Sequence, residues 1–144
     1  YKQDVLLKKS IRQLGQLYLS DDSHSQINAS KTLLHGDYYP GSWLQTSDKH
    51  LKVIDPEFCF YGPAEFDLGV LIAHLMLAQQ PSATIDSVLT KYVKPAHFNE
   101  KLHHQFTGVE LMRRLIGYPQ LPLSLSIEQK RSLLAESRQM LVQG

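Results

Sequence analysis

Two short segments of the sequence carry carboxylates in an arrangement that suits phosphate chemistry. In segment 33–42, Asp37 follows a short apolar run that predicts a strand and precedes a Pro-Gly turn. Eighteen positions after Asp37, Asp55 and Glu57 stand at i and i+2, which an extended backbone would project to the same side. Phosphoryl transfer needs one carboxylate that orients the attacking hydroxyl and accepts its proton, and others that hold magnesium beside the phosphates. Asp37 suits the first role, and Asp55 and Glu57 suit the second.

The elements that must position these carboxylates are mostly helical. Apolar residues recur at helical spacing in five segments, namely 1–19, 65–77, 83–93, 98–116 and 127–142. The polar stretch 20–30 predicts a loop, because Ser, Asp and Asn side chains bond their own backbone. Segments 42–45 and 51–54 predict a β-hairpin whose outer strand ends at Asp55-Pro56, because proline has no N–H to donate. We therefore expect a mainly α fold with one small β-hairpin at its working end.

The composition indicates a single domain with small-molecule partners. The chain has 144 residues, of which 42% are apolar, and this suffices for one ordinary core over residues 1–144. Its 15 Lys and Arg nearly balance its 14 Asp and Glu without a run of five like charges, so we expect no nucleic-acid or membrane partner. The single cysteine, Cys59, can form no internal disulfide, which favours a reducing, cytoplasmic compartment.

Three motifs follow one another along the middle of the chain. They are His-Gly-Asp at 35–37, Ile-Asp-Pro-Glu-Phe at 54–58 and Phe-Asp-Leu-Gly at 66–69. This series resembles the catalytic and metal-binding loops of aminoglycoside phosphotransferases, choline kinases and, most closely, methylthioribose kinases. The resemblance implies the C-terminal lobe of the protein-kinase-like fold. It also implies transfer of phosphate from ATP, with Mg²⁺, to a hydroxyl of a small-molecule acceptor, a sugar or an amino-alcohol.

The resemblance assigns further residues to the support of the catalytic loop. Asp67 would accept hydrogen bonds from the backbone of the 35–37 loop, which His35 also supports. Alternatively, Asp67 serves only as a negative charge at the N-terminus of its helix. Ser42 stands where most relatives carry the asparagine that binds a second magnesium, and Tyr39 stands where they carry a histidine.

Substrate-binding residues are also suggested by the resemblance. Arg113 and Arg114 resemble the arginine pair with which methylthioribose kinases approach their sugar, although a solvated pair at a helix C-terminus is the alternative. Trp43 either lines the substrate pocket or serves as a core aromatic of the hairpin. His103 and His104 are expected at the surface, because adjacent helical positions diverge by ~100° and no second ligand pair lies at zinc-site spacing.

The sequence lacks the parts with which kinases of this architecture grip ATP. Its eight glycines show no phosphate-cradling cluster. We therefore expect that an N-terminal ATP-binding lobe is missing from this chain and that the chain alone is inactive. Two other functions are compatible with the same residues: a degenerate kinase-like binding module without catalysis, and a metal-dependent phosphohydrolase built on the same carboxylates.

Overall fold

The computed structural model describes residues 1, 3–19 and 31–143, so the loop expected at 20–30 lies outside the described residues. Within these ranges, no helix is both long and apolar enough to cross a membrane.

Five α-helices make up most of the described residues, as the apolar spacing predicts. They are α1 (Val5–Leu19), α2 (Glu65–Leu77), α3 (Ser82–Lys91), α4 (Glu100–Ile116) and α5 (Ile127–Gln143). Asp4 caps α1, since its Oδ1 accepts a hydrogen bond from the N–H of Leu7 at 3.0 Å. Asn99 caps α4 in the same way, with the N–H of Leu102 at 3.1 Å. The capping side chains therefore place the starts of α1 and α4 a few residues inside the predicted segments 1–19 and 98–116.

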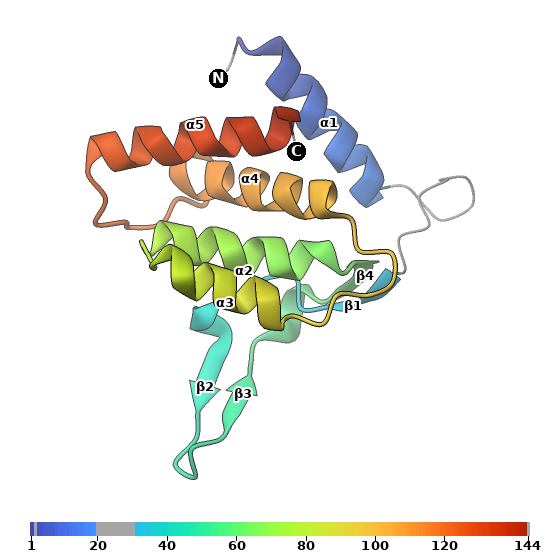
Figure 1. Ribbon diagram of the computed structural model, residues 1–144, viewed down its shortest axis with the longest axis vertical. Helices are drawn as coiled ribbons and strands as arrows, with labels where there is room; N and C mark the ends of the chain where they lie inside the picture. The colour runs from blue at the N-terminus through green and yellow to red at the C-terminus, as the bar shows by residue number, and fades with distance from the viewer. Residues whose placement is uncertain (2, 20–30, 144) are drawn as a thin grey trace.

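Helix α2 lies at the centre of the fold. Figure 1 shows α5, α4 and α2 in successive layers, with α3 beside α2 and α1 crossing near the end of α5. One side of α2 packs toward α3 and the hairpin through Leu68, Leu71, Ile72 and Leu75. Another side packs toward α4 and α5 through Ala73 and Leu77. Because α2 is buried on most sides, its sequence is apolar nearly throughout.

Two glycines allow α4 to approach its neighbours closely. A Cβ on Gly69 in α2 would lie 2.8 Å from the Cβ of Phe106 in α4. A Cβ on Gly108 in α4 would lie 2.8 Å from the carbonyl oxygen of Ser137 in α5. The spacing of the three central helices thus depends on positions that carry no side chain.

The predicted hairpin is present. β2 (Trp43–Gln45) pairs antiparallel with β3 (Leu51–Val53), and the two strands project away from the helices in Figure 1. A mainly α fold with a small β-hairpin is therefore confirmed.

A second two-stranded sheet was not predicted. β1 (Lys31–Leu34) pairs antiparallel with β4 (Phe60–Pro63), with Leu34 opposite Phe60. The whole hairpin region separates these two strands in the sequence, so no local turn signal links them. Their pairing brings the end of β1, where the 35–37 loop begins, beside the start of β4.

Candidate active site

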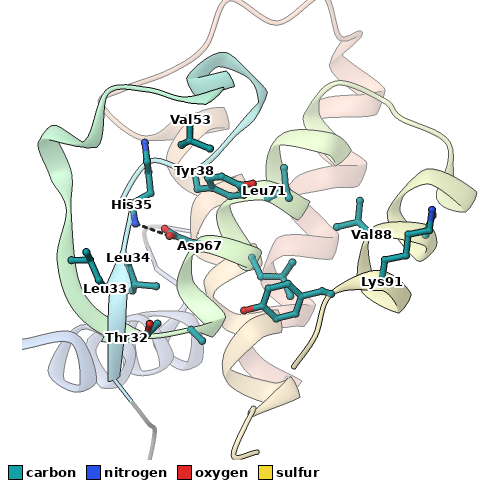
Figure 2. Close-up of a pocket in the computed structure, with 14 residues that line it drawn as sticks. Thr32, Leu33, Leu34, His35, Tyr38, Val53, Asp67, Leu71, Val88 and Lys91 are labelled. Carbon is teal, nitrogen blue, oxygen red and sulfur yellow. Dashed lines mark hydrogen bonds between the residues drawn. The ribbon is translucent and has the colours of Figure 1, made fainter. Parts of the chain in front are cut away.

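Asp67 anchors the loop that carries Asp37. Its Oδ2 accepts a hydrogen bond from the N–H of His35 at 2.7 Å, which Figure 2 shows, and its Oδ1 accepts one from the N–H of Gly36 at 3.0 Å. Asp67 lies in the first turn of α2, the best-buried helix of the fold. These are the hydrogen bonds expected from the resemblance, and they tie the loop to the buried central helix.

Gly36 brings the loop into backbone contact with the turn after Asp55. Its φ of +84° favours glycine, and a Cβ at this position would lie 2.2 Å from the carbonyl oxygen of Phe58. The His35 ring adds a second link, since its Nε2 lies 2.8 Å from the carbonyl oxygen of Ile54. The two sequence motifs that carry the carboxylates are therefore adjacent in space.

Ser42 braces the same loop from its other end. Its buried hydroxyl donates to the carbonyl oxygen of Asp37 at 2.9 Å, and its own carbonyl accepts from the N–H of Ile54 at 2.9 Å. The structure gives this serine a bracing contact; the magnesium contact implied by the resemblance stays a prediction.

Asp55 and Glu57 lie on an exposed turn, with a backbone that differs from the one expected. Asp55 is left-handed at φ 60° and ψ 54°, and Pro56–Phe58 forms a single 3₁₀ turn. The prediction of an extended backbone, which would project both carboxylates to one side, is therefore wrong. Left-handed backbone is tolerated by aspartate, whose short side chain can bond locally.

The chemistry of this turn nevertheless fits a hard divalent cation. Both Asp55 and Glu57 are exposed, and neither carboxylate has a protein partner among the described residues. Mg²⁺ prefers oxygen ligands and is usually held by one or two carboxylates together with water and phosphate oxygens. The carboxylates of Asp55 and Glu57 are available for this role. No cluster of three or more His, Cys, Asp and Glu suited to a metal occurs in the described ranges, so a cation here would depend on these two carboxylates and on non-protein ligands.

The carboxylate of Asp37 is paired with the arginines of α4. Its Oδ1 lies 3.0 Å from Nη2 of Arg114 and 3.9 Å from Nη2 of Arg113. The side chain of Arg114 is only 11% exposed, whereas that of Arg113 is 42% exposed. The interpretation of a solvated pair is therefore wrong for Arg114, which is held beside the candidate base.

A buried glutamate that the sequence analysis missed holds both arginines. Oε2 of Glu110 accepts from Nε of Arg113 at 2.6 Å, and its Oε1 accepts from Nε of Arg114 at 2.7 Å. His74 Nε2 lies 3.2 Å from the same Oε1. Burial alone would raise the pKa of Glu110, but hydrogen bonds from His74 and the two guanidinium groups outweigh burial and hold this pKa at about 2. Glu110 is therefore ionised at neutral pH.

One cavity joins these groups. It has a volume of about 490 Å³, and Asp37, Glu110, Arg113 and Arg114 line its polar side. The aromatic side chains of Phe58, Phe60 and Phe66 line it as well. Such a site suits a small molecule that has an apolar part and at least one hydroxyl group.

A larger cavity of about 820 Å³ opens on a different face of the loop, between β1, α2 and α3 (Figure 2). His35, Tyr38, Asp67 and Lys91 line it, but Asp37 does not. Because the candidate base faces only the smaller of these two cavities, we assign the chemistry to the smaller one.

The remaining aromatic candidates pack against the core. Trp43 lies 5.6 Å from the ring of Tyr38 and lines neither of these two cavities, so the structure favours its core interpretation. Tyr39 stacks on the ring of His74, with the two ring centroids 4.4 Å apart. His103 is 2% exposed, so the expectation of a surface residue is wrong for it, whereas His104 is exposed as expected.

Comparison with known proteins identifies a family and several similar kinases. The family model described as "Phosphotransferase enzyme family" matches residues 2–98. The methylthioribose kinase of Geobacillus thermodenitrificans is 33% identical over 150 residues, which cover 82% of this chain and 38% of that protein. The methylthioribose kinase of Exiguobacterium sibiricum is 44% identical over 78 residues, 54% of this chain and 18% of that protein. Methylthioribose kinase 1 of Oryza sativa is 39% identical over 77 residues, 54% of this chain and 16% of that protein. The chain thus spans less than two fifths of the length of these curated relatives.

Proposed function

The chain belongs to the phosphotransferase enzyme family, and from this premise we propose that it is the C-terminal, catalytic lobe of an ATP-dependent kinase that phosphorylates a hydroxyl of a small molecule. A sugar is the first candidate for the acceptor, because the relatives named above are methylthioribose kinases. The observation that carries the proposal is the position of Asp37. It lines a cavity of suitable size together with two arginines, on a loop that Asp67 anchors to the core.

In the proposed reaction, Asp37 acts on the acceptor hydroxyl. The hydroxyl oxygen forms a bond to the γ-phosphorus of ATP, the bond from that phosphorus to the bridging oxygen breaks, and ADP leaves. The carboxylate of Asp37 orients the hydroxyl and accepts its proton. Arg113 and Arg114 offer planar N–H donors to the acceptor's other oxygens, and the aromatic wall excludes water from its apolar part. Positioning of this kind supplies most of the catalysis in phosphoryl transfer.

Asp55 and Glu57 would hold Mg²⁺, which neutralises charge on the phosphates when it is bound. Their carboxylates are exposed and have no partner among the described residues, which supports this assignment. Ser42 is proposed as an additional ligand on the basis of the resemblance alone. His35 and Asp67 hold the loop, and neither needs to contact the substrate.

The nucleotide would bind between this lobe and an N-terminal lobe. The relatives are more than twice as long as the region that they share with this chain, which supports a further lobe that cooperates with this one. The exposed apolar side chains at Leu44, Leu51, Val53, Phe58 and Tyr61 are consistent with a surface that another part of the protein covers.

The first prediction tests the proposed function directly. The full-length protein, supplied with Mg²⁺ and ATP, should phosphorylate one member of a panel that holds methylthioribose, other pentoses, choline and aminoglycosides. Asp37→Asn should lower kcat by ~10²–10⁴-fold with little change in the KM for ATP, because a positioned base acts mainly in the transition state. ADP release measured with and without each acceptor checks this.

Three outcomes would contradict the proposal. Phosphate release without any acceptor would favour the phosphohydrolase, and nucleotide binding without turnover on the whole panel would favour the binding module. Turnover of the Asp37→Asn variant at the wild-type rate would end the assignment of the base. Glu136→Gln on the exposed face of α5 is a matched control, because it makes the same change of carboxylate to amide far from the cavity residues.

A further inference from the structure

Glu110 lines the same cavity as Asp37 and the two arginines, but it is almost fully buried beside them. We infer that Glu110 is a positioning residue of the proposed acceptor site, one that holds Arg114 on Asp37 and Arg113 at the side of the cavity. The inference rests on the proposed function and adds to it a residue that orients its neighbours. Glu110 is 4% exposed and both of its carboxylate oxygens accept from the arginines, so it acts through them.

The hydrogen bonds of Glu110 fix how the two guanidinium groups point. Each arginine donates its Nε–H to Glu110, at 2.6 Å from Arg113 and 2.7 Å from Arg114. A guanidinium group is planar and rigid, so fixing Nε restricts where its Nη atoms can lie. The Nη2 atom of Arg114 then lies 3.0 Å from Oδ1 of Asp37. Glu110 therefore determines the angle at which Arg114 meets the candidate base.

Glu110 also balances the charges at this place. Two neighbouring arginines repel each other, and one ionised carboxylate cannot offset both. Asp37 and Glu110 together supply two negative charges against the two positive charges of Arg113 and Arg114. If the charge of Glu110 were lost, both guanidinium groups would have Asp37 as their remaining anionic partner in this cluster. The carboxylate of Asp37, which must bind the acceptor hydroxyl, would then be more strongly engaged by the two arginines.

A second route leads from Glu110 back to the catalytic loop. His74 Nε2 lies 3.2 Å from Oε1 of Glu110, and the His74 ring stacks on Tyr39 at 4.4 Å. Because Glu110 is ionised, it accepts here, and the His74 Nε2–H donates. Tyr39 lies two residues after Asp37, so Glu110 contributes both to the placement of the Asp37 carboxylate, through Arg114, and to the loop after it, through His74.

The test is a double-mutant cycle in the full-length protein with Glu110→Gln, Arg114→Gln and the two combined. We expect Glu110→Gln alone to lower kcat/KM for the acceptor about 10-fold, within the range of coupled neighbours, and to leave the KM for ATP unchanged. If Glu110 acts mainly through Arg114, its loss should cost much less in the Arg114→Gln background than in the wild type, with a small remainder that passes through Arg113 and His74. Glu136→Gln is again the control for the change from carboxylate to amide.

A merely structural glutamate would give a different result. Its loss would reduce activity by the same factor in both Arg114 backgrounds, and multiplied effects would therefore overturn the inference. An equal rise in the KM for ATP would overturn it as well. If Glu110→Gln melts below the assay temperature, Glu110→Asp keeps the charge with a shorter reach. This variant should fold and show a smaller loss of kcat/KM, and wild-type kinetics in it would count against the inference.

A measurement that needs no activity separates this inference from the proposed function. In ¹⁵N NMR spectra, the Nε–H signals of Arg113 and Arg114 should be protected from exchange with water, because both make short charge-assisted hydrogen bonds. Glu110→Gln leaves one acceptor oxygen and puts an NH2 group in place of the other, so it should weaken this protection and remove it at one of the two arginines, and Glu136→Gln should not. Unchanged protection at both arginines would overturn the inference even if no acceptor in the panel is phosphorylated.

Discussion

At the residue scale, Asp37 is held from three separate parts of the chain. Asp67 fixes the backbone just before it, Ser42 bonds its carbonyl oxygen, and Arg114 bonds its carboxylate. Asp67 and Arg114 are 30 and 77 positions after Asp37 in the sequence. A local sequence pattern alone therefore could not place the carboxylate. A base that must meet a hydroxyl in one orientation benefits from such fixation, because small displacements of a catalytic group are costly.

The second prediction concerns the exposed carboxylates of the 55–58 turn. Asp55→Asn keeps a residue that tolerates left-handed backbone but removes the charge. In the full-length protein, this change should weaken the binding of magnesium-ATP by more than ~10-fold, and Glu57→Gln should weaken it less. Titration calorimetry with ATP, in the presence and absence of Mg²⁺, measures both. Unchanged affinity in the two variants would rule out the proposed metal site.

The third prediction follows from the burial of His103. Burial lowers the pKa of this histidine from 6.5 to about 4, and the nearby His104 charge adds to the effect. Neither ring nitrogen of His103 has a hydrogen-bond partner in the described part of the chain. Between pH 6.5 and 4 the unfolded chain therefore binds a proton that the folded chain does not. The free energy of unfolding should fall as the pH falls through this window, by ~3 kcal/mol at most.

Thermal melts at pH 7 and pH 4.5 test this prediction. His103→Leu should melt with a smaller difference between the two pH values than the wild type, because it removes the buried titrating group. His97→Leu, at an exposed histidine, should keep the wild-type difference. An equal pH dependence in the wild type and His103→Leu would show that other groups cause the acid sensitivity.

At the scale of elements, the spacing of apolar residues predicted the helices, because the local sequence determines where a helix forms. The apolar run Glu65–Leu77 predicted α2 to the residue, because a helix buried on most sides needs apolar residues nearly throughout. The pairing of β1 with β4 could not be predicted, since it depends on contacts between residues such as Leu34 and Phe60 that no turn connects. The spacing of Glu110 from Arg113 and Arg114, at i+3 and i+4, was a signal that could have been used. Its contact with His74, 36 residues away, could not.

The fourth prediction tests how closely α2 and α4 pack. Gly69→Ala would place a Cβ 2.8 Å from Phe106 Cβ and 3.0 Å from the Thr107 backbone nitrogen. Overpacking of this kind costs about 1–3 kcal/mol, so the variant should melt below the wild type. Gly15→Ala on α1 is the control, because its Cβ would meet nothing within 4 Å. There the better helix propensity of alanine should raise the melting temperature slightly. A melting temperature of Gly69→Ala at or above that of the wild type would contradict the prediction.

At the scale of the whole molecule, the described helices form one continuous packing arrangement. α1 contacts α5, and Arg138 of α5 pairs with Asp4 just before α1 at 2.5 Å, so the start and the end of the chain lie together. The buried core clusters are built mainly from helix residues, whereas the short strands carry exposed apolar side chains such as Leu51 at 65% and Tyr61 at 72% exposure. Asp55 and Glu57 are exposed on the turn between β3 and β4.

The fifth prediction follows from this division. The 144-residue chain alone should melt cooperatively, because its helices bury a core by themselves. It should release no ADP from magnesium-ATP with any acceptor of the panel, since the proposed reaction also needs groups that cover the phosphates. A coupled assay for ADP checks this. Turnover at ~1–100 s⁻¹, a typical kinase rate, would show that no further lobe is required.

The absence of a side chain at Gly36 has a consequence for motion. With Phe58 O at only 2.2 Å from where a Cβ would stand, the loop of Asp37 and the turn of Asp55 lie backbone against backbone. Asp67 also bonds the loop to α2, so the segments that carry Asp37 and Asp55 are joined to the core helix by hydrogen bonds and close backbone contact. Under the proposed function, we expect these two segments to keep their relative positions, and any opening that admits a nucleotide or releases a product to come from movement elsewhere.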